Sequence, residues 1–200
     1  VKWDAWRVYF SDERCVPLDD ADRCFSADSI AYSNYRAVNN ELLKHVKIDS
    51  QHVFTINSEL VKKPAEAAAD YEKTVMKGVG GKGSGDESKV PSFDLVLLGM
   101  GPDGHTCSLF PKHALLQEKK LLIASITDSP KPPPNRITFT LPLVNHARYV
   151  AFVCTGDAKK ESLKQILEEA DCPLPSAQVK ATKVHWFVDK PAASQLKSGL

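Results

Sequence analysis

The stretch that decides the fold is FDLVLLGMGPDGH, residues 93–105. Its first seven residues form a nearly continuous apolar run, which is typical of a central parallel strand covered on both faces. A turn rich in glycine follows Gly99 and carries Asp103 and His105. In sheets of parallel strands, ligands bind where loops leave the carboxyl ends of the strands. This turn is therefore the first candidate for a functional site.

Segments typical of strands and of helices alternate on both sides of this stretch. Apolar, β-branched and aromatic runs predict strands at residues 6–10, 52–56, 121–126, 136–141, 148–154 and 184–188. Helical spacing of apolar residues predicts helices at residues 29–45, 63–77, 157–170 and 191–196. In the helix at 63–77, the apolar stripe is expected at Ala65, Ala68, Ala69, Val75 and Met76. This alternation predicts an α/β fold, with a mostly parallel sheet flanked by helices.

Length and charge exclude several classes of protein. Two hundred residues fit one domain, so we expect a single domain over residues 1–200. Lys and Arg total 26 against 25 for Asp and Glu, a formal net charge of +1. Nucleic-acid binders usually carry a marked basic excess, so no nucleic-acid partner is expected. No apolar run approaches the roughly 18 residues that a membrane helix needs, and no heptad pattern forces an oligomer. We therefore expect no membrane partner and a monomer.

Two further expectations follow from the cysteines and from the first residue of the chain. The five cysteines are odd in number and include no CxxC pair. A disulfide framework is therefore not expected, and a reducing cytoplasm is the predicted compartment. The chain opens at Val1 and enters a strand-like run almost at once. We expect N-terminal sequence to be missing from it.

Two low-complexity segments are interpreted as loops. Residues 78–85, GVGGKGSG, lack the Ser or Thr that follows Gly-Lys in a phosphate-binding loop, and they follow a helix instead of a strand. A flexible insertion is expected at about residues 78–90. Residues 130–134, PKPPP, stand between two predicted strands. That position favours a rigid loop over a ligand for a polyproline-binding domain.

The turn after Gly99 carries residues suited to general-base chemistry. An Asp two residues before a His can orient the imidazole and tune it for proton transfer near neutral pH. Gly101 and Gly104 permit positive φ and let a ligand approach the backbone closely. The alternative interpretation is a Gly-Pro-Asp-Gly turn after which His105 packs locally.

Two more polar clusters follow predicted strands. SDER at residues 11–14 follows the first strand, and Arg14 could bind a phosphate or carboxylate with two parallel hydrogen bonds. The alternative is a solvated cluster of charges in a loop. TGDAK at residues 155–159 joins a strand to a helix. Backbone N–H groups at that junction, together with Lys159, could bind an anion, although a lysine in a first helical turn is usually solvated.

Taken together, these segments resemble the 6-phosphogluconolactonase family of the glucosamine/galactosamine-6-phosphate isomerase superfamily. The likeness is carried in chain order by SDER at 11–14, SNY at 33–35, GMGPDGH at 99–105, SLFP at 108–111, DSPKPP at 128–133, RIT at 136–138 and VHWFVD at 184–189. It implies a Rossmann-like, phosphosugar-isomerase-like fold and a cytoplasmic hydrolase of the oxidative pentose phosphate pathway. The expected substrate is 6-phosphoglucono-1,5-lactone, with no metal and no cofactor. The resemblance also implies that the family's N-terminal strand and helix, with their phosphate loop, have no counterpart in these residues.

The resemblance also implies roles for individual residues. His105 is the base that draws a proton from the water attacking the lactone carbonyl, and Asp103 places it. The residues expected to bind substrate, chiefly its phosphate, are Arg14, Gly101, Arg136 and Lys159. Backbone near Gly101 is also a candidate for stabilising the developing oxyanion.

Several alternatives stay open at this point. An aminosugar-phosphate deaminase or isomerase carries an Asn-Glu-Pro element after the same turn, whereas SLFP stands here at residues 108–111. A thiol hydrolase using Cys107 and a metal site built from Asp103, His105 and His113 are weaker alternatives. A non-catalytic domain that binds sugar phosphates is the alternative from another class of protein.

Overall fold

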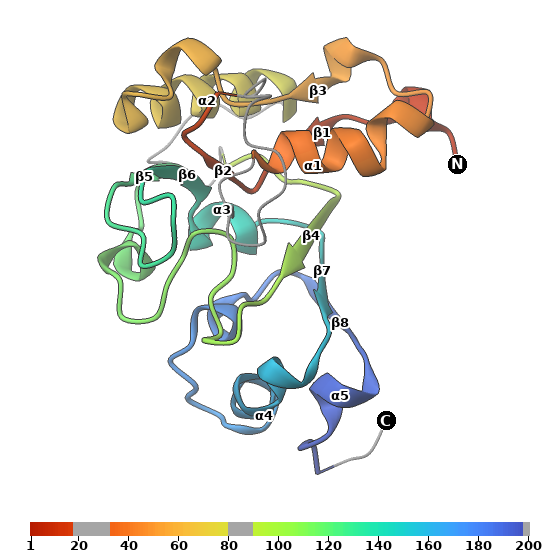
Figure 1. Cartoon of the computed structure of the whole chain (residues 1–200), viewed down its shortest axis with the longest axis vertical. Helices are drawn as coiled ribbons and strands as arrows, with labels where there is room; N and C mark the ends of the chain where they lie inside the picture. Colours follow the sequence, from red (N-terminus) through yellow and green to blue (C-terminus); the bar gives the residue numbers. More distant parts are fainter. Residues whose placement is uncertain (18–32, 80–89, 198–200) are drawn as a thin grey trace. The chain divides into compact units, whose positions relative to one another are not determined.

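The structure is a computed structural model that describes residues 1–17, 33–79 and 90–197. The chain divides into two compact units, of which the first comprises Val1–Gly78 and Ile123–Thr138 and the second Val79–Leu122 and Phe139–Leu200. Figure 1 shows the elements in chain order. This division into two units does not show whether either unit folds by itself. The single domain expected over residues 1–200 therefore stays a prediction. Most of the glycine-rich insertion expected at about 78–90 lies outside the described residues.

The first unit contains one parallel strand pair. β1 (Val8–Tyr9) pairs in parallel with β3 (Val53–Phe54). The prediction of a longer strand at residues 6–10 is wrong at both ends, because the pairing with β3 extends over two residues only. Phe10 lies beyond the strand and is buried.

A second sheet in the first unit contains an antiparallel strand that the sequence did not predict. Its order is β2 (Asp12–Arg14), β6 (Arg136–Phe139) and β5 (Ile123–Ile126). β2 and β6 run antiparallel, and Arg14 lies opposite Arg136. Residues 11–14 were expected as a polar cluster in the loop that follows the strand predicted at residues 6–10. Strand formation here depends on pairing with a segment more than 120 residues away, which local propensity does not encode.

Two helices belong to the first unit. α1 (Asn34–Glu41) begins after Ser33, whose hydroxyl accepts a hydrogen bond from the Arg36 N–H at 3.3 Å. It ends four residues before the predicted boundary, and a 3-10 turn follows at Leu43–His45. α2 (Pro64–Val79) begins at a proline, which lacks an N–H and therefore suits the first turn of a helix.

The buried stripe of α2 differs in part from the predicted one. Its buried residues are Ala67, Ala68, Tyr71, Val75 and Met76, whereas the predicted Ala65 and Ala69 are exposed. The prediction missed Tyr71, the largest residue of the buried stripe. Alanines lie on several faces of this helix, so their spacing does not single out the face that is buried. The Tyr71 hydroxyl is fully buried and accepts a hydrogen bond from the Phe10 N–H at 2.7 Å. This contact ties α2 to the chain that follows β1.

The second unit contains a fully parallel three-stranded sheet. Its order is β4 (Leu95–Gly99), β7 (Tyr149–Cys154) and β8 (Lys183–Val188). Gly99 pairs with Val153, which pairs with Phe187, so the carboxyl ends of the strands lie at one edge. The other helices are α3 (Leu141–Asn145), α4 (Lys160–Glu168) and α5 (Lys190–Ala193). Further 3-10 turns lie at Trp3–Ala5, Ser50–His52, Ser58–Leu60, Ala114–Gln117, Asp157–Lys159 and Pro175–Gln178.

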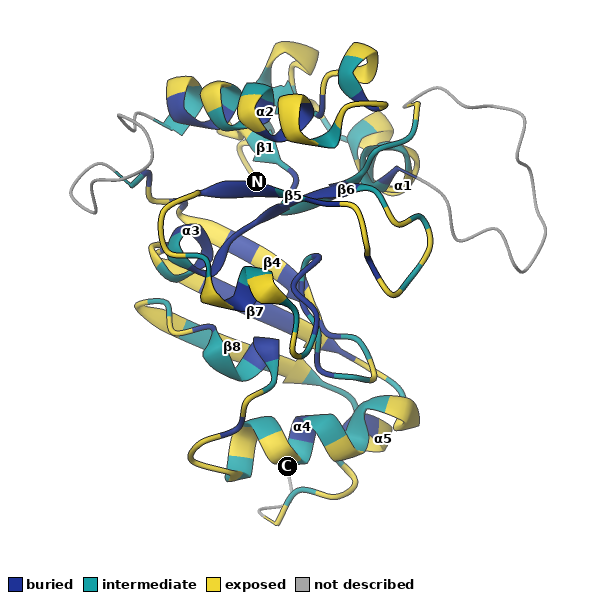
Figure 2. Cartoon of the chain, turned by 90° about the vertical axis from the view of Figure 1, so that its left-hand side faces the viewer, coloured by how far each residue is buried: buried dark blue, intermediate teal, exposed yellow. Residues whose placement is uncertain are grey.

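One face of this parallel sheet is buried and the other is exposed. Buried on the first face are Val96, Leu98, Val150 and Phe152. Leu95, Leu97, Tyr149, Val153 and Phe187 alternate with those positions and are exposed, Leu97 to 63%. Figure 2 shows the alternation along β4 and β7. The expectation that residues 93–99 are covered on both faces is therefore wrong for this structure, since an apolar run does not specify what covers each face.

Two general predictions can be compared with the described residues. Within residues 1–17, 33–79 and 90–197, no helix is long and apolar enough to cross a membrane. The four described cysteines, Cys15, Cys107, Cys154 and Cys172, are free thiols. Cys24 lies outside the described residues.

Candidate active site

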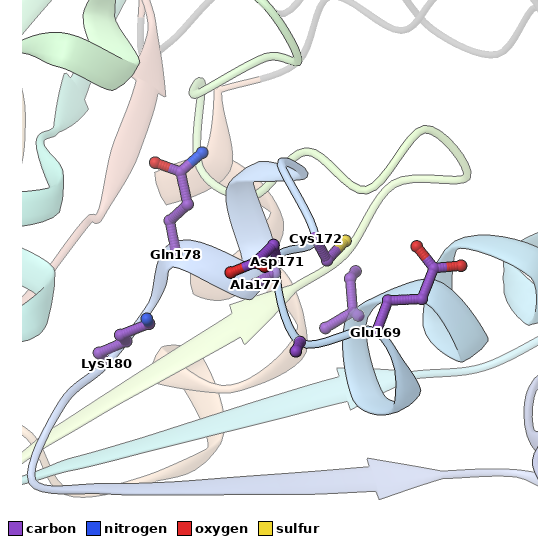
Figure 3. A pocket seen from close by; sticks show the side chains of 8 residues that line it. Glu169, Asp171, Cys172, Ala177, Gln178 and Lys180 are labelled. Atoms are coloured by element: carbon purple, nitrogen blue, oxygen red, sulfur yellow. The ribbon is translucent and has the colours of Figure 1, made fainter.

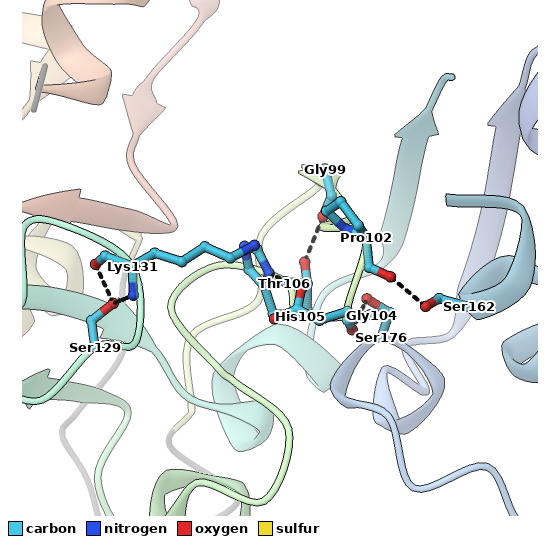
Figure 4. Close-up of polar contacts among 10 residues, drawn as sticks. Gly99, Pro102, Gly104, His105, Thr106, Ser129, Lys131, Ser162 and Ser176 are labelled. Carbon is cyan, nitrogen blue, oxygen red and sulfur yellow. Dashed lines mark hydrogen bonds and ion pairs between the residues drawn. The ribbon is translucent and has the colours of Figure 1, made fainter. Parts of the chain in front are cut away.

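The turn after β4 is closed by its own backbone. The Gly101 N–H donates to the His105 carbonyl at 2.9 Å, and the Gly104 N–H donates to the Gly101 carbonyl at 2.9 Å. The Thr106 hydroxyl donates to the Gly99 carbonyl at 2.9 Å, which fixes the end of the turn to the end of the strand. Figure 4 shows this last contact. The turn is thus a defined structure at the carboxyl edge of the sheet, as the sequence predicted.

Two serines from other parts of the second unit hold the same turn. The Ser162 hydroxyl on α4 donates to the Pro102 carbonyl at 2.5 Å, and the Ser176 hydroxyl donates to the Gly104 carbonyl at 2.9 Å (Figure 4). Gly104 itself adopts φ of 77°, a region that disfavours other residues. The sequence contains no local signal for either serine, because both contacts join residues at least 60 positions apart.

Asp103 and His105 form a hydrogen-bonded pair within the turn. The His105 Nδ1 lies 2.5 Å from the Asp103 Oδ1. The His105 side chain is 17% exposed and that of Asp103 38%, so the pair is sheltered and still open to solvent. A carboxylate at Nδ1 favours the tautomer with the proton on that nitrogen. Nε2 is then the ring nitrogen that can accept a proton. The Phe110 ring packs against the imidazole, with centroids 4.8 Å apart.

Gly101 is required for this arrangement for steric reasons. A Cβ at residue 101 would collide with Nδ1 and Cε1 of His105 and would lie 2.7 Å from the Asp103 Oδ1. The imidazole and the carboxylate therefore occupy the space that any side chain at residue 101 would need. Gly101 was expected to let a ligand approach the backbone closely, and in the structure it is the side chains of Asp103 and His105 that approach it.

Lys159 follows the strand next to β4. It ends the 3-10 turn Asp157–Lys159, just beyond the carboxyl end of β7. Because Gly99 and Val153 are paired, Lys159 and His105 follow neighbouring strands at the same edge of the sheet. The Gly156 N–H donates to both carboxylate oxygens of Asp189, each at 3.1 Å. The Gly156 N–H belongs to the strand-to-helix junction that was expected to bind an anion. In the structure this N–H is bound by the Asp189 carboxylate.

The two predicted arginines lie side by side in the first unit. Arg14 on β2 and Arg136 on β6 are directly opposed in the antiparallel pair. Arg136 is only 3% exposed. Burial lowers the pKa of Arg136, the charge of Arg14 lowers it further, and the charge of Asp12 raises it. A guanidinium nevertheless stays protonated in proteins, so these two residues concentrate positive charge on one strand pair.

Glu13 supports this strand pair. From the sequence, Asp12 or Glu13 was expected to hold the Arg14 guanidinium, whereas the Glu13 carboxylate accepts from backbone N–H groups and from Ser33. It is fully buried. Its Oε1 accepts from the N–H groups of Arg14 at 2.7 Å and Asn34 at 2.6 Å, and its Oε2 accepts from the Ser33 hydroxyl and the Tyr35 N–H, each at 2.8 Å. Burial raises the pKa of Glu13, and these four hydrogen bonds act in the opposite direction. Glu13 thereby joins the start of α1 to β2.

The metal alternative gains no geometric support in the part of the chain that the structure describes, and the thiol alternative at Cys107 stays untested. No group of three or more His, Cys, Asp or Glu side chains in that part of the chain could hold a metal ion. The Nδ1 of His113 accepts from the Leu115 N–H at 3.2 Å and so caps a 3-10 turn. Burial, with the charge of Glu13, raises the pKa of the Cys15 thiol to about 11, which keeps that thiol protonated and poorly nucleophilic at neutral pH.

A pocket of about 260 Å³ lies elsewhere in the second unit. Its lining includes Glu169, Asp171, Cys172, Gln178 and Lys180 (Figure 3). None of the predicted site residues contributes to it. The candidate site therefore rests on the His105 turn and on the arginine pair, each within its own unit.

Comparisons with known proteins place the chain in a family. The family model for glucosamine-6-phosphate isomerases and 6-phosphogluconolactonase matches residues 1–186. The human 6-phosphogluconolactonase is 46% identical, over 96% of this chain and 68% of the human one. A probable 6-phosphogluconolactonase of Schizosaccharomyces pombe is 43% identical, over 98% of this chain and 75% of its own length.

A solved structure agrees with these sequence matches. The crystal structure of 6-phosphogluconolactonase from Thermotoga maritima is similar with a TM-score of 0.74 and 32% identity, over 94% of this chain and 74% of that one. The α/β chain with its His–Asp turn therefore belongs to the glucosamine-6-phosphate isomerase and 6-phosphogluconolactonase family. Within that family, the human and Thermotoga maritima relatives are named 6-phosphogluconolactonase and the Schizosaccharomyces pombe relative a probable one. The Rossmann-like fold class predicted from the sequence is confirmed.

Proposed function

We propose that this chain hydrolyses 6-phosphoglucono-1,5-lactone to 6-phosphogluconate, with His105 as the general base. The observation that carries the proposal is the contact between His105 Nδ1 and Asp103 Oδ1 at the carboxyl end of β4. Membership of the family, with relatives named 6-phosphogluconolactonase at 43–46% identity, supports the substrate.

The chemistry follows from the tautomer that Asp103 favours. The Nε2 of His105 accepts a proton from a water molecule as its oxygen attacks C1 of the lactone. The C1–ring oxygen bond of the tetrahedral intermediate then breaks, and His105 returns the proton to the departing ring oxygen. One residue thus serves both half-reactions, and the net change is the addition of one water. General-base catalysis of this kind typically contributes about 10²–10⁴-fold.

The remaining predicted residues supply positive charge for the anionic substrate. Arg14 and Arg136 concentrate two guanidinium groups on β2 and β6, and guanidinium geometry suits phosphate oxygens. Lys159 lies at the same sheet edge as the His105 turn. We assign Arg14 and Lys159 to substrate binding. The Gly101 N–H, which was a candidate donor for the oxyanion, already donates to the His105 carbonyl at 2.9 Å.

An assay with two substrates tests this function against its alternatives. Freshly generated lactone is offered to the chain, 6-phosphogluconate is followed by coupled oxidation, and the spontaneous rate is subtracted. Ammonia release from glucosamine 6-phosphate is measured in parallel. Catalysed lactone hydrolysis without ammonia release is expected. Ammonia release would instead indicate a deaminase. Tight binding of 6-phosphogluconate with neither reaction would indicate a non-catalytic sugar-phosphate domain.

A further inference from the structure

The peptide that precedes His105 is held by one residue that lies 72 positions beyond Gly104 in the chain. The Gly104 carbonyl accepts from the Ser176 N–H at 3.1 Å and from the Ser176 hydroxyl at 2.9 Å (Figure 4). A carbonyl oxygen has two lone pairs, so these two donors use its whole accepting capacity. Gly104 and Ser176 are both buried, so water is a poor substitute for either bond.

The peptide that follows His105 is held as well. The His105 carbonyl accepts from the Gly101 N–H at 2.9 Å. Both peptide planes that meet at the His105 Cα are therefore fixed by hydrogen bonds. The imidazole is in turn held by the Asp103 Oδ1 at Nδ1 and by the packed ring of Phe110. The position of the base thus depends on its backbone as much as on its side-chain contacts.

The segment that carries Ser176 packs directly against Gly104. A Cβ at residue 104 would lie 2.8 Å from the Cδ1 of Leu174, so this leucine occupies the space beside the Gly104 backbone. The 3-10 turn Pro175–Gln178 follows at once and contains Ser176. With the N–H of Ser176 alone, the Gly104–His105 peptide could tilt about a single hydrogen bond. The hydroxyl supplies the second contact, which opposes that tilt.

We propose that Ser176 is a positioning residue, whose hydroxyl fixes the Gly104 carbonyl so that the imidazole of His105 stays against the Asp103 carboxylate. This inference rests on the proposed function, since it concerns the same reaction. Ser176 acts through His105 and has no contact with the substrate in this account. Its loss should therefore change the rate of the chemical step and not the binding of the lactone.

Ser176→Ala removes the hydroxyl and keeps the N–H. It should lower kcat by about 10-fold and leave KM unchanged, because a displacement of about 1 Å can cost about 100-fold and the remaining N–H limits the movement. Thr140→Val is the matched control. Thr140 is also buried in the second unit, and its hydroxyl donates to the Leu121 carbonyl at 2.6 Å.

Both of these variants lose a buried hydroxyl that donates to a backbone carbonyl, so we expect a similar fall in Tm. Only Ser176→Ala should lose kcat. Wild-type kcat in Ser176→Ala, or an equal loss of kcat in both variants, would overturn the proposal. If Ser176→Ala does not fold, Ser176→Cys takes its place with the same expectations, because a thiol is similar in size and only a weak donor.

A double variant with Asp103→Asn shows whether Ser176 acts through the catalytic pair. If the Ser176 hydroxyl works by keeping His105 against Asp103, it matters less once that carboxylate is gone. The double variant should then lose less kcat than the product of the two single losses. Losses that multiply would overturn the proposal.

NMR of the His105 ring separates this inference from the proposed function. If the wild type does not hydrolyse lactone, the proposed function fails, and the signal of the His105 Nδ1 proton then decides the inference. The wild type and Thr140→Val should show the same signal from a proton held between the imidazole and Asp103. In Ser176→Ala this signal should shift or broaden. An unchanged signal in Ser176→Ala would overturn the inference.

Discussion

The tautomer of His105 depends on the chemical identity of residue 103. The Asp103 carboxylate accepts only, so it requires a proton on Nδ1 and leaves Nε2 as the proton acceptor. An amide at the same position presents an NH₂ group as readily as an oxygen. The imidazole can then turn to the opposite tautomer, in which Nε2 carries the proton and is no longer a base.

Asp103→Asn should therefore lower kcat by about 10²–10⁴-fold while the fold is retained, since the side chain changes little in size. Steady-state kinetics measures the loss, and ¹⁵N NMR of the His105 ring reports the tautomer. Wild-type kcat in this variant, with the proton still on Nδ1, would show that the carboxylate is not needed to orient the ring.

Gly101→Ala should lower kcat by about 10²-fold, because the new methyl group collides with the imidazole and a displacement of about 1 Å can cost that much. Gly99→Ala is the matched control, since a Cβ there meets nothing within 4 Å. Circular dichroism should show both variants folded. Equal kcat values in the two variants would contradict the steric account of Gly101.

At the scale of elements, Glu13 connects β2 to the start of α1 through four hydrogen bonds. All four partners are donors, and an ionised carboxylate is the group that accepts from all of them. Because Glu13 and Ser33 are both buried, a loss of hydrogen bonds at this carboxylate is poorly compensated by water.

Glu13→Gln should lower the free energy of unfolding by about 2–3 kcal/mol, since the amide NH₂ faces groups that also donate. Denaturant unfolding of this variant, compared with Glu41→Gln at the exposed end of α1, measures the difference. Equal stability of the two variants would mean that the carboxylate at residue 13 does not hold the helix to the strand.

Elements that follow a local pattern could be predicted from the sequence, and elements that depend on distant partners could not. The apolar run of β4 and the turn up to His105 are encoded in 13 adjacent residues, and both were predicted. β2 is a strand because of β6, and the Ser162 and Ser176 contacts depend on chain that comes later. The exposed face of the β4–β7–β8 sheet was missed because an apolar strand does not specify its covering layer.

At the scale of the whole molecule, the arginine pair and the Asp103–His105 pair belong to different units of the chain. Arg14 and Arg136 lie in the first unit, whereas Asp103, His105 and Lys159 lie in the second. We expect substitution of Arg14 and substitution of His105 to change different kinetic constants.

Arg14→Ala should raise KM for the phosphorylated lactone by about 10-fold or more and change kcat little, because it removes a charge-assisted contact that forms before the reaction. Initial rates over a range of lactone concentrations separate the two constants. A loss confined to kcat would place Arg14 in the chemical step and contradict its assignment to phosphate binding.

The proposed role of His105 is to remove the proton from the attacking water. Its most direct test is the rate of lactone hydrolysis by wild type and by His105→Ala, corrected for the spontaneous reaction, with His45→Ala at an exposed histidine as the control. We predict that His105→Ala loses about 10²–10⁴-fold in kcat with an unchanged circular dichroism spectrum, and that His45→Ala behaves as wild type. Full activity in His105→Ala would contradict the account.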